Sequence, residues 1–442
     1  MMPRRGKEST VQTRPDPVIW AVVMMTTLCL SCTDESMTDV LVVESDVKSA
    51  SFSDVMFGVD SEQNATEPSI VTRAESLGIT QYRGLITPRE ESREAPITTY
   101  GFQSEEGPQC MRGAPFLTSV RDVGSENLVI FLQGGGACWS FFCLAVTGAP
   151  AGVPAIDILN TNLEANPTRD WNAVYVPYCD GSFFVGDADI DDNLNDKGLR
   201  THRGLANLTG AYEVAAMRFP NPKKVLLAGS SGGAYGLLMA GTLLRTYYPE
   251  TELIIMADSG IGIARDKDPD YIQLPVSEFN LNRFIPEDCE ECLKTGHLTA
   301  LVSWFLKHDP AVRVGMFSSW YDSIIANVFL QIDPQEHAQS LREQTDLVHH
   351  AYPKRFKRFI TDGIQHTALI ADTSGIIGSD LNEFEYPLDV LANIVGGGLK
   401  IGGLDSTRID DFTIGEWLGG LIENDESVWI DILEEAGPPP EE

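Results

Sequence analysis

Basic residues are scarce in this sequence. Its 32 Lys and Arg stand against 64 Asp and Glu, which gives a formal net charge of −32 over 442 residues. A field of that sign repels nucleic acid and anionic membrane surfaces, so it argues against DNA or RNA as a partner. We interpret the excess of acidic residues as an adaptation for solubility. An acidic polymer would be a suitable substrate only where local basic residues offset the repulsion.

The N-terminal part lacks an apolar run long enough to span a bilayer. Its apolar stretch VIWAVVMMTTLCL, residues 18–30, is too short for a transmembrane helix, but four basic residues precede it and Ser31-Cys32 follows. This pattern is typical of an export signal and resembles that of bacterial lipoproteins. We expect residues 1–32 to be such a signal, with lipidation at Cys32; cleavage with release and an uncleaved anchor are the alternatives. The chain would then be exported, to the bacterial cell envelope or the medium.

Cysteine is also rare, with eight residues, two of which belong to this signal. The other six are an even number, which in an exported chain predicts up to three disulfides among fifteen pairing patterns. They are Cys110, Cys138, Cys143, Cys179, Cys289 and Cys292. The Cys289-x-x-Cys292 pair lacks a second CxxC and a nearby histidine set, so we expect neither a metal nor another cofactor.

The chain divides by composition into a tether, a domain and a tail. Residues 33–90 are rich in Ser, Thr, Asp and Glu without a sustained hydrophobic period, which predicts an acidic tether. Residues 435–442 predict a solvent-exposed, acidic, proline-rich tail. Residues 91–434 alternate strand-like and helix-like segments, so we expect them to form a single domain, monomeric in solution.

Six short apolar runs in this domain are predicted as strands. Their continuous apolarity is typical of strands buried on both faces of a parallel sheet. Helical patterns such as residues 233–248 lie between several of them, so we predict an α/β fold with a mostly parallel sheet flanked by helices. Functional residues are then expected just past the carboxyl ends of the strands. The runs are residues 127–133, 171–178, 223–229, 252–258, 312–319 and 355–361.

The stretch VLLAGSSGGAYG, residues 225–236, predicts a strand, a sharp turn and a helix with a G-x-S-x-G core. A serine exposed in a strained turn needs small neighbours two residues away on each side. Ser231 has glycine at both places, whereas Ser230 has Ala228 on one side, so the spacing favours Ser231 as a nucleophile. The alternative, a phosphate-binding turn, lacks the G-K-[ST] and G-x-G-x-x-G patterns.

A serine nucleophile needs a base and an acid from later strands. His366 follows the last predicted strand, as the chain order Ser, Asp or Glu, His requires. Two acids fit by position: Asp322 after the strand at 312–319 and Asp258 at the end of the preceding strand. Strand order favours Asp322 without excluding Asp258. Residues 134–137, Gly-Gly-Gly-Ala, follow an early strand and predict a loop whose backbone N–H groups form an oxyanion hole.

Several motifs resemble those of the pectin acetylesterase and Notum family of α/β-hydrolase-like serine carboxylesterases. FLQGGGACWSFFC, YCDGSFFVGD, LLAGSSGGAYG and SSWYDSIIAN occur in the family's order between about residues 110 and 366. The resemblance implies a triad, an oxyanion hole and a Cys138–Cys143 disulfide. It also implies that Ser230 stands next to the nucleophile without being the nucleophile, and that Asp258 has a structural role. The triad is Ser231, Asp322 and His366, the oxyanion donors are the backbone N–H groups of Gly136, Ala137 and Gly232, and the candidate substrate contacts are Trp139, Asp180 and Tyr321.

Four residues depart from the family pattern. Ala137 replaces a tryptophan that lines the acyl pocket, with Trp139 two places on, so we expect an acyl site of different size. Thr367 replaces a cysteine, which removes one family disulfide, and Ile324-Ile325 replace polar residues.

We therefore expect a secreted serine carboxylesterase that hydrolyses O-acyl esters, acetyl first, on a polysaccharide such as pectin. Its partner would be this acylated substrate, with no nucleic acid and with membrane contact only through the lipid anchor. Longer acyl esters or a polyester are the alternative substrates. An alternative of another class is a catalytically dead, surface-binding lipoprotein on a hydrolase scaffold.

Overall fold

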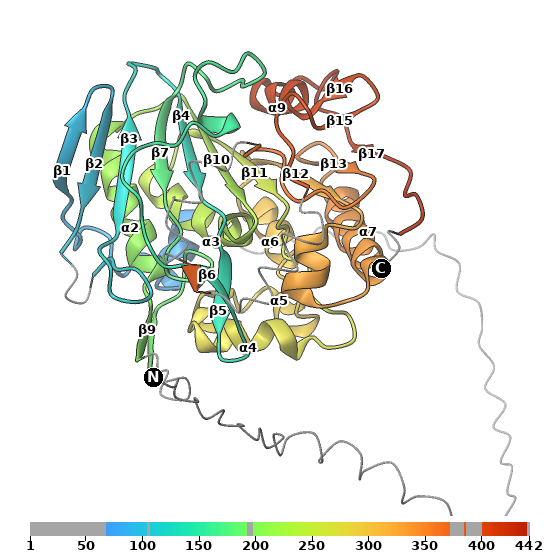
Figure 1. Cartoon of the computed structure of the whole chain (residues 1–442), viewed down its shortest axis with the longest axis horizontal. Coiled ribbons are helices and arrows are strands. Elements are labelled where there is room, and N and C mark those ends of the chain that lie inside the picture. Colours follow the sequence, from blue (N-terminus) through green and yellow to red (C-terminus); the bar gives the residue numbers. More distant parts are fainter. Residues whose placement is uncertain (1–67, 104–106, 192–197, 372–383, 386–399, 440–442) are drawn as a thin grey trace, which may run out of the picture. The chain divides into compact units, whose positions relative to one another are not determined.

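A ten-stranded sheet forms the centre of the molecule, in the order β1-β2-β3-β7-β4-β10-β11-β12-β13-β17 (Figure 1). The computed structural model describes residues 68–103, 107–191, 198–371, 384–385 and 400–439. β1, β2, β3 and β7 pair antiparallel with one another in turn, whereas every pair from β7 to β17 is parallel. The strands are β1 (Arg89–Glu94), β2 (Ile97–Gly101), β3 (Leu117–Arg121), β4 (Leu128–Leu132), β7 (Asn172–Val176), β10 (Lys224–Ser230), β11 (Glu252–Asp258), β12 (Arg313–Ser319), β13 (Phe356–Thr361) and β17 (Ile432–Leu433). All six predicted strands are present, and the predicted mostly parallel sheet is confirmed.

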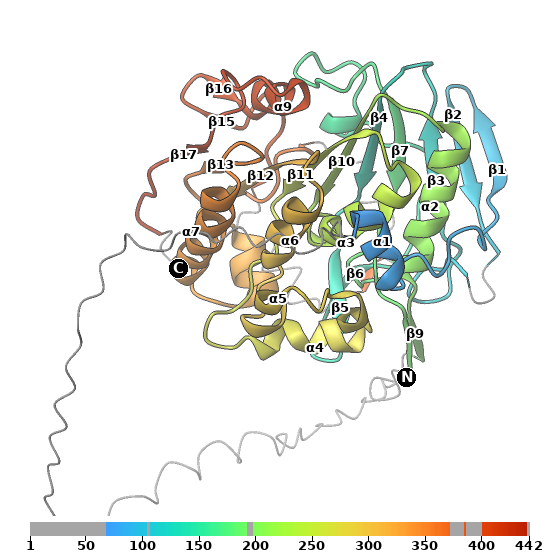
Figure 2. The ribbon, with the colours of Figure 1, turned by 180° about the vertical axis from the view of Figure 1, so that it is seen from behind.

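Both faces of the sheet are covered, which explains the continuous apolarity of its strands. In β10, Val225 and Leu227 pack into one buried cluster, and Leu226 and Ala228 pack into the cluster on the opposite face. The first cluster contains residues of α1, α2, α3, α6 and α7 (Figure 2), and the second contains those of α9. The helices are α1 (Ile70–Ser76), α2 (Gly204–Arg218), α3 (Gly232–Tyr247), α4 (Asp270–Glu278), α5 (Glu290–Lys294), α6 (Ala300–His308), α7 (Pro334–Ala351) and α9 (Ile414–Glu423).

Smaller elements lie beyond the carboxyl ends of the parallel strands. The hairpin of β5 (Gly136–Trp139) and β6 (Phe142–Val146) follows β4 and pairs with β14 (Phe384–Glu385) (Figure 1). A π-helix, Ile324–Leu330, follows β12. A further hairpin is formed by β8 (Ala188–Asp191) with β9 (Leu199–His202). The hairpin of β15 (Arg408–Ile409) and β16 (Phe412–Thr413) lies beside α9, away from this edge (Figure 1).

The folded part extends further in both directions than the sequence predicted. Ile70 and Ala74 of α1 are buried in the main core, so residues 70–90 are not all tether. At the other end, Gly437 donates its N–H to Asp362 Oδ1 at 3.0 Å and accepts the Tyr321 hydroxyl at 2.6 Å, so the expected solvent-exposed tail is attached to the domain at this residue. The signal, Cys32 and most of the tether lie outside the described residues. Among the helices that are described, none combines the length and apolarity needed to cross a membrane.

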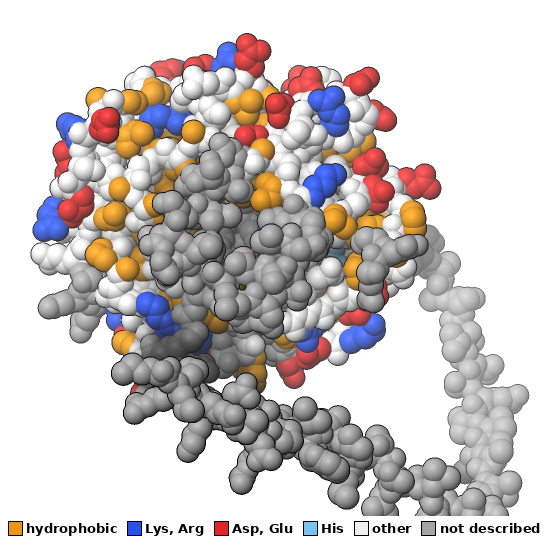
Figure 3. Space-filling view, in the orientation of Figure 1, with side chains coloured by type: hydrophobic (Ala, Val, Ile, Leu, Met, Phe, Trp, Pro, Cys, Tyr) orange, Lys and Arg blue, Asp and Glu red, His pale blue; other side chains and the backbone are white. Residues whose placement is uncertain are grey.

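Charge is dispersed over the face seen in Figure 3. Asp and Glu side chains lie among Lys and Arg there rather than in a separate region. The described residues visible in this view form no extended basic surface of the kind that nucleic acid requires.

Candidate active site

Ser231 occupies the turn between β10 and α3 in a strained backbone conformation. Its φ is 55° and its ψ is −122°, a region that non-glycine residues rarely adopt. A Cβ on Gly229 would lie 2.8 Å from the carbonyl carbon of Gly233, and a Cβ on Gly233 would lie 2.3 Å from the carbonyl oxygen of Leu132. Only glycine therefore fits on either side, and the strained turn presents a partly exposed Ser231.

Ser230 has a different environment. It is the last residue of β10 and is fully buried, and its hydroxyl donates to Asp258 Oδ2 at 2.5 Å. Two adjacent serines are thus distinguished by the turn itself: Ser230 faces a buried carboxylate, and Ser231 faces a cavity.

The acid and the base come together at the same edge of the sheet. His366 follows β13, and its Nδ1 lies 3.0 Å from both carboxylate oxygens of Asp322, which follows β12. Asp322 is fully buried, and its Oδ1 also accepts the backbone N–H groups of Ile324 at 3.1 Å and Ile325 at 3.0 Å. The backbone N–H of His366 donates to the carbonyl of Lys400 at 2.8 Å. These contacts hold the imidazole with Nδ1 toward a carboxylate, an arrangement in which the other ring nitrogen can accept a proton.

The glycine-rich loop after β4 lies against the turn that carries Ser231. Gly136 has a φ of 80°, and a Cβ there would lie 1.8 Å from the carbonyl oxygen of Leu144, so only glycine fits. A Cβ on Gly232 would lie 2.6 Å from the carbonyl oxygen and 3.6 Å from the nitrogen of Gly136. The structure therefore brings Gly136 and Gly232 together beside Ser231. Ala137 is fully buried in β5 opposite Leu144.

A small, largely apolar cavity of about 20 Å³ lies at Ser231. Four aromatic side chains contribute to its wall; two of them, Phe142 of the β5–β6 hairpin and Phe329 of the π-helix, were not among the predicted site residues. The lining residues are Gly136, Phe142, Leu144, Phe183, Ser231, Gly232, Tyr235, Ile324, Ile325, Val328 and Phe329. The isoleucines that depart from the family pattern thus face the cavity.

Trp139 stands behind this wall rather than in it. Its ring centroid is 4.8 Å from that of Phe142, 6.0 Å from that of Phe329 and 5.5 Å from that of Tyr271. Tyr271 in turn donates its hydroxyl to the carbonyl of Phe329 at 2.6 Å. Trp139 therefore supports the two phenylalanines that narrow the cavity.

The structure does not bring the other two candidate substrate contacts to the cavity. Asp180 is buried and accepts the hydroxyl of Ser182, and burial raises its pKa to about 7. Tyr321 is buried too, and its hydroxyl is bound to Gly437. Both side chains have structural partners within the protein.

Six cysteines form three disulfides: Cys110–Cys179, Cys138–Cys143 and Cys289–Cys292. The Cys138–Cys143 bridge closes the hairpin next to Gly136, as the family resemblance implies. Because Cys289 and Cys292 are bonded to each other, their sulfurs are not thiolate ligands for zinc.

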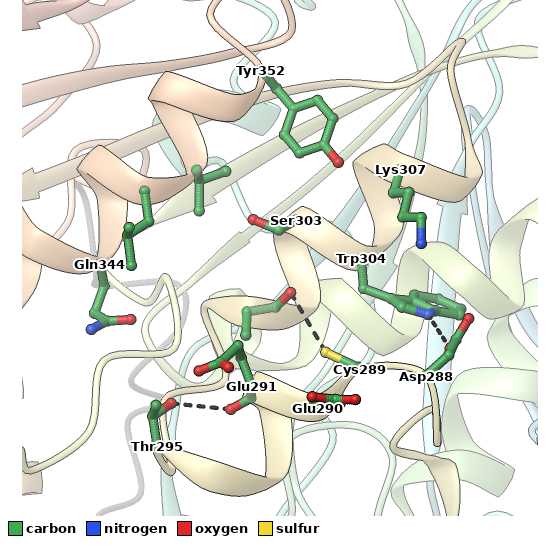
Figure 4. Close-up of a pocket in the computed structure, with 13 residues that line it drawn as sticks. Asp288, Cys289, Glu290, Glu291, Thr295, Ser303, Trp304, Lys307, Gln344 and Tyr352 are labelled. Atoms are coloured by element: carbon green, nitrogen blue, oxygen red, sulfur yellow. Dashed lines mark hydrogen bonds between the residues drawn. The ribbon is translucent and has the colours of Figure 1, made fainter. Parts of the chain in front are cut away.

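A larger cavity lies away from this site. It has a volume of about 560 Å³ and is lined by α5, α6, α7 and the segment before α5 (Figure 4). Trp304 donates its indole N–H to Asp288 Oδ1 at 2.7 Å at its margin. The larger cavity is lined by none of the candidate triad residues. The candidate site is the small cavity, because Ser231 lines it together with Ile324 and Ile325, whose backbone N–H groups bind Asp322.

Comparison with known proteins places this arrangement in a family. The pectinacetylesterase family model matches residues 89–345, more than half of the chain, a range that includes Ser231 and Asp322 and ends before His366. Pectin acetylesterases 11 and 7 of Arabidopsis thaliana are each 26% identical to it, over 189 and 185 residues. These matches cover 39% and 38% of this chain and 47% and 46% of the relatives, so the chain spans about half the length of the curated relatives it matches.

The structure of the Wnt deacylase Notum from Drosophila is similar with a TM-score of 0.52 at 15% identity. The similarity covers 80% of this chain and 97% of Notum, and it shows the α/β-hydrolase-like fold. Together with the family match, these findings establish that the chain belongs to the pectinacetylesterase family.

Proposed function

We propose that this protein is an exported serine carboxylesterase that removes short O-acyl groups, acetyl first, from a polysaccharide such as pectin. The observation that carries the proposal is the Asp322–His366 contact at the sheet edge where Ser231 occupies a strained turn. Family membership supports the ester chemistry, and the names of the Arabidopsis relatives support the substrate.

In the proposed mechanism, Ser231 Oγ attacks the carbonyl carbon of the ester while His366 Nε2 accepts the hydroxyl proton. Asp322 keeps Nδ1 protonated and stabilises the imidazolium. The backbone N–H groups of Gly136, Ala137 and Gly232 donate to the oxyanion. The C–O bond to the sugar then breaks as His366 returns the proton to the leaving alcohol. Water, deprotonated by His366, hydrolyses the acyl-enzyme and releases a carboxylic acid.

The size of the cavity supports a short acyl group. A volume of about 20 Å³ is close to the space of a single water molecule, so it suits a methyl group better than a long chain. A fatty acyl group or a polyester segment would require Phe142, Val328 or Phe329 to move. We therefore favour acetyl esters over the longer substrates.

The first test is hydrolysis of p-nitrophenyl acetate by the domain from residue 66, which forms one compact unit. We expect Ser231→Ala to lower kcat by at least about 10³-fold, because no other group supplies the nucleophile. Ser76→Ala, an exposed serine of α1, is the control and should keep wild-type activity. An inactive wild type, or a fully active Ser231→Ala variant, would favour the dead-scaffold alternative.

The second test uses p-nitrophenyl esters of increasing chain length. We expect kcat/KM to fall steeply beyond acetate in the wild type, because pocket size limits the acyl chain. Phe329→Ala should raise kcat/KM for the butyrate relative to the acetate by about tenfold, since the removed ring enlarges the cavity. Phe412→Ala, an aromatic residue on the opposite face of the sheet, should leave this ratio unchanged. Equal activity on acetate and octanoate in the wild type would contradict the short-chain proposal.

Export is supported by the three disulfides, which persist in oxidising compartments. We further propose that the chain is held at the bacterial envelope by lipid on Cys32, from the signal pattern alone. Mass spectrometry of the mature N-terminus tests this: a diacylglyceryl adduct on Cys32 supports it, and an unmodified N-terminus overturns it.

A further inference from the structure

Asp258 is bonded both to the nucleophile strand and to the segment that carries the histidine. It is the last residue of β11, and it lies directly opposite Ser230 at the end of β10. Its fully buried carboxylate accepts the Ser230 hydroxyl at 2.5 Å, the Ala368 N–H at 2.8 Å and the Leu369 N–H at 3.2 Å. Three donors satisfy a charge that would otherwise be costly to bury, and two of them follow His366 within three residues.

Two further hydrogen bonds, made by Asp258 and Ser259, join the same two segments. The N–H of Ser231 donates to the carbonyl of Asp258 at 2.8 Å. The hydroxyl of Ser259 accepts the N–H of Thr367 at 2.8 Å, and Thr367 has a φ of 69°. The dipeptide Asp258-Ser259 therefore contacts the nucleophile on one side and the residue after the catalytic histidine on the other.

We propose that Asp258, bonded to Ser230, is a positioning residue that fixes residues 366–369 relative to the nucleophile turn. We call Ser230 and Asp258 the clamp and residues 366–369 the histidine loop. The catalytic part of this inference rests on the proposed function; the structural part, that the clamp orients His366, does not.

The bonding pattern separates this role from that of the triad acid. Nδ1 of His366 contacts Asp322, whereas the carboxylate of Asp258 is bonded to backbone N–H groups beyond the ring. Other hydrogen bonds join the histidine loop to segments outside β10: His366 N–H to the carbonyl of Lys400, Thr367 N–H to the hydroxyl of Ser259, Gly402 N–H and the Gln365 amide to the carbonyl of Thr367, and Ile158 N–H to the carbonyl of Leu369. Loss of the clamp would leave the Asp322 contact in place but free the loop to shift, and a displacement of about 1 Å at a reacting group lowers rates by about 10²-fold.

The test compares Ser230→Ala, Ser230→Cys and Asp258→Asn on p-nitrophenyl acetate. Asn keeps the shape of Asp but turns one acceptor into a donor that faces the backbone N–H groups. We expect kcat to fall about tenfold in Ser230→Ala and about 100-fold in Asp258→Asn, with KM within about twofold of wild type. Ser230→Cys should recover part of the loss, because a thiol is a weak donor in the same place.

Ser119→Ala is the matched control, because Ser119 is a buried serine in β3 whose hydroxyl is bonded to Thr99. It should lower the thermal midpoint as Ser230→Ala does and leave kcat unchanged. A loss of kcat in Ser119→Ala equal to that in Ser230→Ala, or clamp variants within twofold of wild type, would overturn the inference.

A second readout does not depend on activity. The proton between His366 Nδ1 and Asp322 gives a low-field ¹H NMR resonance, which we expect to shift or broaden in Ser230→Ala and to stay unchanged in Ser119→Ala. An inactive wild type whose resonance responds in this way would refute the proposed function and support the clamp. An unchanged resonance in Ser230→Ala would refute the clamp. This measurement decides the question even where Asp258→Asn fails to fold.

Discussion

Asp258 is the last residue of β11 and Asp322 follows the adjacent parallel strand β12, and both side chains are fully buried. Asp258 is still inside the ladder, paired with Ser230 on one side and Phe317 on the other, so its carboxylate meets backbone N–H groups of the histidine loop. Asp322 lies three residues beyond β12, at the start of the π-helix, and its carboxylate meets the imidazole. The same residue type at the same sheet edge thus orients a backbone segment in one case and a ring in the other, and the distance past the strand end decides which.

The largest effect that separates the two aspartates is expected from Asp322→Asn. An amide cannot hold Nδ1 protonated as a carboxylate does, so the imidazole adopts the wrong tautomer for taking the Ser231 proton. We expect kcat to fall on the order of 10³–10⁴-fold with little change in KM, more than in Asp258→Asn. Steady-state kinetics on p-nitrophenyl acetate measures both variants. A larger loss in Asp258→Asn would reverse the two roles.

A smaller effect concerns stability as a function of pH. Burial raises the pKa of Asp258 to about 6, against the opposing effects of Ser230, the N–H groups of Ala368 and Leu369, and the nearby His366. Between pH 4 and 6 the folded state therefore holds a proton that the unfolded state has released, so this residue's contribution to stability falls as pH rises through that window.

Urea unfolding of wild type and Asp258→Asn at pH 4, 5, 6 and 7 measures this contribution. The stability of wild type relative to the variant should decrease by about 2 kcal/mol from pH 4 to 6 and then level off. A difference that is constant across this range would show that the carboxyl group titrates equally in both states.

Two local rules sufficed to select the serine and the histidine of the proposed triad from the sequence. Parallel strands place their carboxyl ends at one edge, so Ser231, His366 and either Asp322 or Asp258 were expected to lie there from chain order, and the family resemblance then favoured Asp322 as the acid. Glycine spacing favoured Ser231 over Ser230, and the backbone of the turn has the positive φ that this spacing anticipates. The alternative acid, Asp258, was left open because strand position alone does not separate two aspartates at neighbouring strand ends.

The ends of the domain and the substrate contacts were harder to predict. Tyr321 and Asp180 were named from their motifs, but the structure bonds them to Gly437 and Ser182. α1 has a short apolar pattern that looks like a tether until its burial against the core is seen. Gly437 and the core residues that cover α1 come from distant segments, which no local pattern specifies, whereas Ser182 lies two residues from Asp180 in the same motif.

By itself the sequence determined the sheet, the nucleophile turn and the glycine loop, because these depend on short-range backbone sterics and on the period of buried residues. Only the tertiary structure decided the size of the cavity beside Ser231. Its wall joins Phe142 from the hairpin with Phe329 from the π-helix, supported by Trp139. That wall is a packing of side chains almost 200 positions apart, and close packing depends on the fold rather than on any one segment.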